Sequence, residues 1–264
     1  MVLGYNEPRP TEQNYKDFIN KLKVGLKNLG ERGVSLMLYG SYIRGNYVSG
    51  RSDIDAILVF PNNVVIDKEK LNVASKALAQ AQEGNNIPFQ VTVTDLRTMQ
   101  EGTFNSFEPD FLPYFEDERR IITGPDYTTT FKYTMPKHPN QVPLRFNLRK
   151  SRTGLLFSEY DRNTDYKRFL ERFNKTLDAT SRASKQILSM VDGHLRKNRF
   201  SALEELSIFF PNLDTQPLKR VKSLYHNLGD LDRLYQNPEE LIKVWDESVT
   251  FFECLVKSYL ELRK

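Results

Sequence analysis

The chain has one cysteine, Cys254, among its 264 residues, and it has no long apolar run. A single cysteine excludes an internal disulfide bond and is typical of proteins from reducing compartments. No stretch approaches the roughly 18–20 consecutive apolar residues that a membrane-spanning helix needs. The opening residues, MVLGYNEPRPTEQ, contain neither a basic segment nor an apolar core, so we expect no secretory signal. We therefore expect a cytoplasmic protein without a membrane partner.

Histidine is also scarce, and the three histidines are far apart in the sequence. None of them stands at metal-ligand spacing from the cysteine or from another histidine, so the pattern does not indicate a zinc site. We find no internal repeat and no low-complexity segment. Hydrophobic residues make up 39% and charged residues 27% of the chain, which is typical of a globular protein. The length is comfortable for two modest domains.

Charge is unevenly distributed, although the net charge is only +4. Residues 1–124 contain 14 Lys and Arg against 16 Asp and Glu, whereas residues 132–199 contain 16 against 6. Within the basic part, the stretch RFNLRKSR from Arg145 to Arg152 carries four cations. A basic segment of this kind binds a polyanion such as nucleic acid or nucleotide phosphates, or it simply forms a solvated face. The sequence leaves both interpretations open.

The first half of the chain alternates between helical and strand periodicity. The spacing of apolar residues predicts helices over 11–30 and 67–83. Short apolar or alternating runs predict strands over 34–39, 53–60, 89–95 and 119–124. We therefore expect an α/β (α+β) domain with a small mixed sheet over residues 1–124.

The pattern changes after residue 124. Residues 125–160 begin with a stretch rich in Pro, Thr and Asn, and we predict that they form a linker or irregular connection. Residues 161–264 show helical periodicity almost throughout, with helices expected over 165–195, 201–210, 217–228 and 238–262. This order predicts an all-α helical bundle as the second domain. Such a bundle also offers a surface for oligomer formation.

The stretch LMLYGSYIRGNYVSGRSDIDAILVF carries the chemistry. Two apolar strands enclose a loop that begins with Gly40-Ser41 and ends with Asp53-Ile54-Asp55. Because side chains alternate along a strand, Asp53 and Asp55 are expected on one face, roughly 6.5–7 Å apart along the backbone. Two carboxylates this close repel each other unless a cation lies between them. Mg²⁺ accepts such a pair together with water and substrate phosphates. We therefore predict that Asp53 and Asp55 are catalytic metal ligands.

The start of the loop is suited to a phosphate. Gly40 and Ser41 follow a strand and precede a short expected helix, SYIRG, so they offer backbone N–H groups and a hydroxyl to an anion. Arg44 and Arg51 flank the loop and either contact a triphosphate or remain solvated. A metal site and a phosphate site that face each other across a loop are what metal-assisted nucleotidyl transfer requires.

The stretch YGSYIRGNYVSGRSDIDAILV resembles the signature of the DNA polymerase β-like nucleotidyltransferase superfamily. An α/β part followed by helices resembles the aminoglycoside nucleotidyltransferase type within it. The resemblance implies that Asp53 and Asp55 hold Mg²⁺ and that an NTP such as ATP donates an NMP group to a hydroxyl, releasing pyrophosphate. The nucleotide-binding residues expected on this basis are Gly40, Ser41, Arg44 and Ser52.

The chain departs from the family pattern at one position. Many members carry a third carboxylate on the next strand, and our alignment places Gln90 there. Glutamine does not accept a proton at neutral pH and is a poorer Mg²⁺ ligand than a carboxylate. Asp95 faces the other way by alternation and is expected to cap the following turn. Three explanations stay open: two carboxylates suffice, a base comes from Glu159, Asp161 or Asp165, or nucleotide is bound without transfer.

The acceptor also remains open between two classes. A small cationic acceptor such as an aminoglycoside needs an acidic cleft, whereas the basic segment 132–199 favours an anionic acceptor such as an RNA or tRNA end. A hypothesis from another class is a non-catalytic nucleotide- or RNA-binding module on the same fold. Gln90 is the residue that motivates it.

Overall fold

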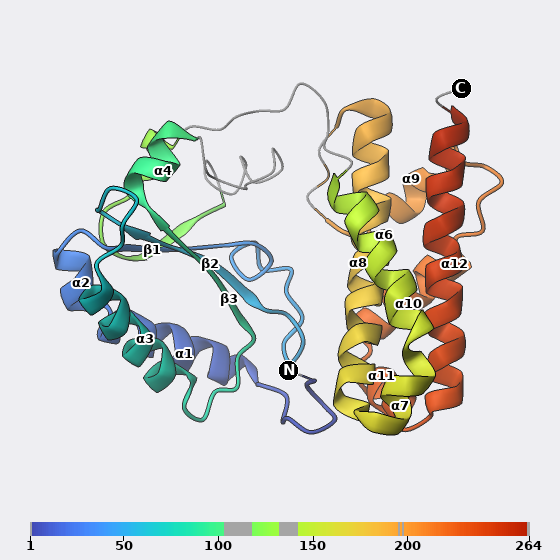
Figure 1. Ribbon diagram of the computed structural model, residues 1–264, viewed down its shortest axis with the longest axis horizontal. Helices are drawn as coiled ribbons and strands as arrows, with labels where there is room; N and C mark the ends of the chain where they lie inside the picture. Colours follow the sequence, from blue (N-terminus) through green and yellow to red (C-terminus); the bar gives the residue numbers. More distant parts are fainter. Residues whose placement is uncertain (1, 103–117, 132–141, 195, 197, 263–264) are drawn as a thin grey trace. The chain divides into compact units, whose positions relative to one another are not determined.

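The chain folds into two compact units in the computed structural model (Figure 1), which describes residues 2–102, 118–131, 142–194, 196 and 198–262. One unit comprises Glu7–Pro136, and the other comprises Met1–Asn6 together with Lys137–Lys264. The first residues therefore group with the helical unit, whereas we had expected them in the α/β domain. There Val2 and Leu3 are buried, and the ring of Tyr5 lies 5.3 Å from that of Tyr166.

The α/β unit contains one four-stranded sheet in the order β3-β2-β1-β4. Strand β1 runs antiparallel to β2 and β4, whereas β2 runs parallel to β3, so the sheet is mixed as expected. The elements are α1 (Glu12–Gly25), α2 (Lys27–Glu31), β1 (Ser35–Tyr39), β2 (Ile54–Phe60), α3 (Lys68–Gln82), β3 (Phe89–Asp95), α4 (Leu96–Glu101), β4 (Arg120–Thr123) and the 3₁₀ turn η2 (Thr128–Thr130).

Side-chain capping fixes where the helices of this unit begin. Thr11 and Asn14 form a reciprocal capping box at the start of α1. Asp67 accepts hydrogen bonds from the N–H groups of Glu69 and Lys70 at the start of α3. Asp95 caps α4 through the N–H of Thr98, as the sequence predicted. This cap gives the carboxylate of Asp95 a structural role, so its presence does not require a role in catalysis.

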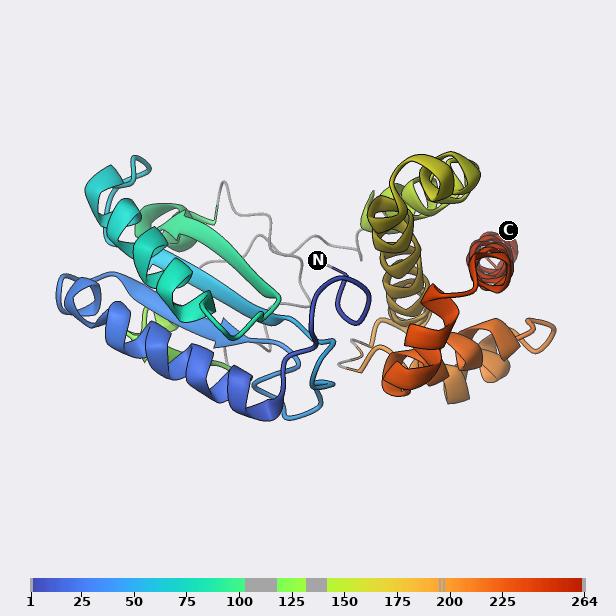
Figure 2. The same ribbon diagram turned by 90° about the horizontal axis from the view of Figure 1, so that it is seen from below.

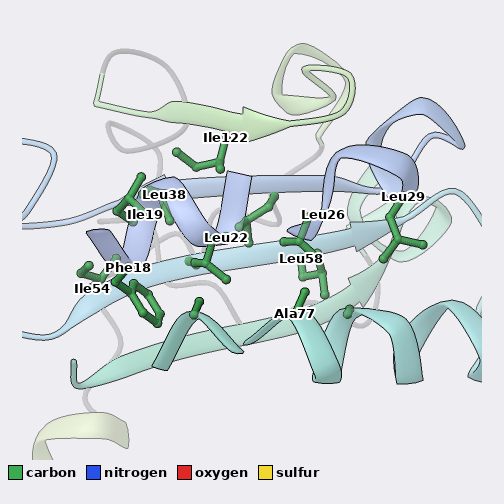
Figure 3. Close-up of a cluster of buried hydrophobic side chains, with 14 of the residues drawn as sticks. Phe18, Ile19, Leu22, Leu26, Leu29, Leu38, Ile54, Leu58, Ala77 and Ile122 are labelled. Atoms are coloured by element: carbon green, nitrogen blue, oxygen red, sulfur yellow. The ribbon is translucent and has the colours of Figure 1, made fainter. Parts of the chain in front are cut away.

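Helices α1 and α3 cover one face of the sheet (Figure 3). Because strand residues alternate, Ile54, Leu58 and their even-numbered neighbours on β2 point into this core. The odd-numbered side chains point to the opposite face, where Ile57 and Val59 pack with Met99 of α4. Asp55 belongs to this second face by the same alternation. An apolar strand thus anchors a carboxylate that is not part of the main core.

The second unit is built of helices. Its elements are α6 (Val142–Leu156), α7 (Ser158–Thr164), α8 (Tyr166–Asp192), α9 (Ala202–Phe209), α10 (Gln216–His226), α11 (Leu228–Tyr235) and α12 (Pro238–Leu262). The long helix α12 is seen nearly end-on in Figure 2. Among the residues that the structure describes, no helix is long and apolar enough to cross a membrane.

A buried aromatic cluster holds the helical unit together. Trp245 on α12 is fully buried, and its ring lies 5.7 Å from Phe169 and 5.8 Å from Phe173, both on α8. Its indole Nε1 donates a 2.9 Å hydrogen bond to the hydroxyl of Thr176. A buried tryptophan needs such an acceptor, so the position of this ring is set by both packing and polarity.

Helix α6 corrects the prediction that residues 125–160 are irregular. Residues 142–156 are helical, and η2 and α7 also fall within that range, whereas residues 132–141 lie outside the described part. Leu144, Leu148 and Ser151 are buried at helical spacing. The stripe then reaches Gly154, where a Cβ would lie only 2.9 Å from the ring of Trp245. Packing against Trp245 thus requires small residues at positions where a helix prediction relies on large apolar ones, and the sequence pattern therefore did not indicate α6. Helix α11 was also not predicted.

Replacing Gly154 with alanine is expected to lower the free energy of unfolding of the helical unit. The added methyl group overlaps the fixed ring of Trp245, and overpacking of this kind costs about 1–3 kcal/mol. Gly229→Ala on α11 is the matched control, because its Cβ meets its nearest atom at 3.6 Å. It should gain up to about 1 kcal/mol from helix propensity.

Urea unfolding followed by tryptophan fluorescence checks this prediction. Trp245 is the only tryptophan, so its emission reports on the helical unit alone. Equal stability of the Gly154→Ala variant and the wild type would contradict the tight approach of α6 to α12.

Candidate active site

The two sheet pairings of β2 bring the predicted site together. Tyr39 at the end of β1 pairs with Asp55, and Asp55 pairs with Gln90 near the start of β3. Paired residues on neighbouring strands project to the same face, and the strands lie about 4.8 Å apart. Asp55 therefore lies between Tyr39 and Gln90, and Gln90 is exposed. Asp53 directly precedes the strand, which begins at Ile54 and not at residue 53 as expected.

Gly40 and Asp55 are in close contact. The backbone of Gly40 is left-handed, with φ of 81°, and a Cβ at this position would lie 2.4 Å from Oδ2 of Asp55. A side chain is therefore excluded on two grounds, backbone conformation and space. The glycine that the sequence singled out for phosphate binding thus adjoins the carboxylate singled out for metal binding.

The residues after Gly40 form a turn and not the short helix that we expected. The N–H of Arg44 donates to the carbonyl of Gly40 at 3.2 Å, and the N–H of Asn46 donates to the carbonyl of Ser41 at 3.2 Å. Gly45, with φ of 72°, ends this single turn. The N–H of Arg44 is the first that is hydrogen-bonded within the turn, so the N–H groups of the three residues between Gly40 and Arg44 form no hydrogen bond within it. Such a turn offers several donors to an anion.

Arg44 is oriented by an ion pair. Its Nη1 lies 3.7 Å from Oε2 of Glu118, and both side chains are largely buried, with 16% and 13% of their surface exposed. This arrangement differs from the solvated alternative that the sequence left open. Glu118 holds the guanidinium close to the loop, and an anion that binds Arg44 has to compete with this carboxylate.

Ser52 has a role within the loop. Its side chain is buried, and its hydroxyl oxygen accepts a 2.8 Å hydrogen bond from the N–H of Val48. Its carbonyl accepts a 2.6 Å hydrogen bond from the hydroxyl of Tyr15 on α1. Both bonds fix the backbone immediately before Asp53. The contact of Ser52 with nucleotide remains a prediction.

Three tyrosines that the sequence did not assign to the site support the loop. The ring of Tyr15 stacks on Tyr42 at 5.9 Å and lies 5.1 Å from Tyr47, whose hydroxyl donates to Glu12. Burial raises the pKa of Tyr15 and of Tyr42 above the ordinary value, so their hydroxyls stay protonated. The sequence contains one signal of this role: Tyr15 lies on the apolar stripe of a predicted helix, and a buried tyrosine hydroxyl needs a hydrogen-bond partner.

The segment before α1 also holds the loop. Nη1 of Arg9 donates to the carbonyl of Gly50 at 2.9 Å, and the hydroxyl of Ser49 donates to the carbonyl of Pro10 at 3.4 Å. These contacts join residues about forty positions apart. No periodic pattern marks them in the sequence, because they arise only when the sheet places the loop beside the segment.

The acidic residues considered as a source of a base lie in the helical unit. Asp161 is only 1% exposed, and its oxygens lie 2.8 Å from Nε of Arg168 and 2.7 Å from Nη1 of Arg172. Asp165 caps α8 through the N–H of Arg168. Asp161 is thus a buried partner of two guanidinium groups. It has a structural role, whereas the sequence analysis considered it as a candidate base. Glu159 is exposed.

The donor set suits a metal that the substrate helps to bind. Within the described part of the chain, no three His, Cys, Asp or Glu side chains come together as a metal site. Mg²⁺ is usually bound through one or two carboxylates plus substrate phosphates. Asp53 and Asp55 fit this incomplete type of site better than a cage made only of protein ligands.

The turn at Gly40 and the carboxylate of Asp55 thus adjoin each other within the α/β unit. In a comparison with protein-family models, residues 19–123 match the nucleotidyltransferase domain. The α/β unit therefore contains a nucleotidyltransferase domain, and the predicted membership of the DNA polymerase β-like superfamily is confirmed for this part of the chain.

Among solved structures, the chain is similar to spectinomycin adenyltransferase AAD(9) from Enterococcus faecialis, crystallised with ATP and spectinomycin. The two share 12% sequence identity, and the TM-score is 0.48. The similarity covers 89% of this chain and 99% of the other. No curated protein matches the chain by sequence.

The predicted metal and nucleotide roles of this site imply that Gly40→Ala weakens binding of Mg²⁺–ATP, because the added methyl group displaces the carboxylate of Asp55. Gly45→Ala is the matched control: it has the same left-handed strain, about 1–2 kcal/mol, but nothing lies within 4 Å of its Cβ. Calorimetric titration should show a loss of at least about tenfold in affinity for Gly40→Ala only. Equal losses in both variants would mean that strain alone matters.

Proposed function

We propose that this protein is a Mg²⁺-dependent nucleotidyltransferase that transfers an NMP group from an NTP to a hydroxyl acceptor. The acceptor oxygen forms a bond to the α-phosphorus, the bond from that phosphorus to the bridging oxygen breaks, and pyrophosphate leaves. The hydroxyl proton passes to a base. The observation that carries the proposal is the contact between Gly40 and Asp55 within the matched nucleotidyltransferase domain.

Each residue of the loop has a distinct task in this proposal. Asp53 and Asp55 would hold Mg²⁺, which when bound neutralises charge on the triphosphate. The turn after Gly40, together with the hydroxyl of Ser41, would donate hydrogen bonds to phosphate oxygens. Arg44 would add a positive charge whose position Glu118 sets before the nucleotide binds.

The base remains the least defined part of the chemistry. Gln90 pairs with Asp55 in the sheet, and this pairing supports the proposal that it replaces a third carboxylate, although an amide does not accept the proton. The burial of Asp161 argues against this residue as the base, whereas Glu159 and Asp165 are exposed. The proton therefore passes to solvent at a site that works with two carboxylates, or to one of these two exposed side chains.

A second candidate function is a nucleotide- or RNA-binding module without transfer activity. The register that places Gln90 beside Asp55 favours it, because the amide weakens both metal binding and proton removal. The acceptor of the first candidate is an RNA end or a small molecule. A titration of each NTP and a panel of hydroxyl acceptors identify the donor and the acceptor.

The double substitution Asp53→Asn/Asp55→Asn is expected to abolish Mg²⁺-dependent binding of NTP without unfolding the chain. Removing both carboxylates leaves the metal without protein ligands. Calorimetric titration of each NTP, with Mg²⁺ and then with EDTA, measures the effect and identifies the donor. Asp67→Asn is the control, since asparagine also caps a helix. Wild-type affinity in the double variant would refute the proposal.

Gln90→Glu is expected to raise pyrophosphate release by about tenfold or more, because a carboxylate beside Asp55 can serve as a base and a metal ligand. Gln90→Ala should leave nucleotide affinity almost unchanged. Turnover is measured as pyrophosphate formed with a panel of hydroxyl acceptors. Release by the Gln90→Glu variant but not by the wild type would favour the binding module. Loss of NTP binding in Gln90→Glu would contradict the assigned position.

A further inference from the structure

Helix α6 carries a concentration of positive charge. Its sequence, VPLRFNLRKSRTGLL, contains four cations and no carboxylate. Leu144 and Leu148 face the interior, so Arg145, Arg149 and Lys150 lie on the exposed side. Within the described residues, neither Arg149 nor Lys150 forms an ion pair.

The exposed side also presents aromatic rings. Phe146 is 46% exposed, and Nζ of Lys150 lies 4.4 Å from the centre of its ring. Where α6 meets α7, Phe157 is 42% and Tyr160 is 60% exposed, with ring centres 6.3 Å apart. The guanidinium of Arg172 lies 5.2 Å from the Phe157 ring. We call the surface made by these groups the α6–α7 face; it comprises Arg145, Phe146, Arg149, Lys150, Phe157 and Tyr160.

The arrangement is costly for the helix itself. Arg145 and Arg149 stand four residues apart, and Arg149 and Arg152 stand three apart, so like charges are neighbours on the helix surface. Such pairs destabilise a helix by about 0.2–0.5 kcal/mol each. Arg152 pairs with Glu253 at 2.5 Å, which offsets part of this repulsion. Elsewhere in the unit, arginines such as Arg220 lie between two glutamates. Packing therefore does not explain the charge on α6.

We propose that the α6–α7 face binds single-stranded nucleic acid. Cations along one helix contact successive phosphates, while exposed aromatic rings stack with bases, and this combination is how sequence-tolerant single-strand binders work. The inference goes beyond NMP transfer and does not depend on it. The bound strand needs no particular sequence, because every base has a face that stacks.

Two other occupants fit the face less well. A membrane surface requires an aliphatic stripe to insert, but Leu144 and Leu148 are buried within the unit, and Leu156, which is 79% exposed at the end of α6, is a single side chain and not a stripe. A second copy of the chain bound face to face would bring the same cations together, and like charges disfavour such a symmetric contact. Charge complementarity thus selects an anionic strand with rings to stack.

The test is fluorescence anisotropy of the full chain with labelled oligo(U) and oligo(A) RNA of about 12 nucleotides, over a series of salt concentrations. Arg149→Gln/Lys150→Gln should weaken binding by about tenfold or more at low salt. It should also reduce the slope of log affinity against log salt by about 1.4, or 0.7 for each lost contact. Lys219→Gln/Lys222→Gln on α10 removes the same charge from exposed positions and serves as the control.

A second pair of variants tests stacking separately from charge. Phe146→Ala should weaken binding by about fivefold or more without a change in salt slope, since stacking involves no counterion. Ile208→Ala removes an apolar side chain that is 74% exposed on α9 and should have no effect. Circular dichroism of Phe146→Ala confirms that the helices are intact.

The outcomes separate this inference from the proposed function. Asp53→Asn/Asp55→Asn should bind RNA like the wild type, and Arg149→Gln/Lys150→Gln should bind Mg²⁺–NTP like the wild type. Absence of RNA binding, or equal weakening by the α10 control, overturns the inference. A third outcome would assign the face to a membrane instead. In that case the wild type binds no RNA but binds vesicles rich in phosphatidylserine, and Arg149→Gln/Lys150→Gln does not bind them.

Discussion

The carboxylate of Asp55 occupies the space that any side chain at position 40 would need, and the arrangement of the site depends on this contact. The antiparallel pairing of β1 with β2 creates it, because Tyr39 pairs with Asp55 and Gly40 follows at once. The same pairing leaves the turn after Gly40 beside the start of β2. A glycine therefore joins the expected phosphate-binding turn to the expected metal ligand with no side chain between them.

Uncharged hydroxyl groups fix the backbone immediately before Asp53. Tyr15 donates to the carbonyl of Ser52, and Ser52 in turn accepts from Val48. Because burial raises the pKa of Tyr15, the hydroxyl remains an uncharged donor at neutral pH. Additional fixed anions beside Asp53 and Asp55 would increase the repulsion that a metal has to offset. The hydroxyls of Tyr15 and Ser52 hold this part of the loop without adding to that negative charge.

The sequence predicted the sheet and the two ends of the loop because short apolar strands and a glycine turn leave local patterns. The register pairs Gln90 with Asp55, whereas the equivalence of Gln90 to a third carboxylate stays a prediction. Non-local contacts were missed, such as the hydrogen bond from Tyr15, which spans 37 residues. Helix α6 was not predicted, because the position that faces Trp245 is occupied by Gly154 and not by an apolar residue that would mark the stripe. The short helix expected after Gly40 is a single turn, because Gly45 is left-handed.

The contrast between the inner and outer sides of α6 follows from one constraint. Its inner side has to accommodate a fixed tryptophan, so it uses small residues such as Ser151 and Gly154 that contribute little apolar burial. The apolar stripe of this helix is narrow, and like charges on its outer side reduce the stability of the helix. Neutral or mixed-sign residues would have served the fold better. The charge on α6 is therefore best explained by an anionic ligand on the outer side, which would offset the repulsion when it binds.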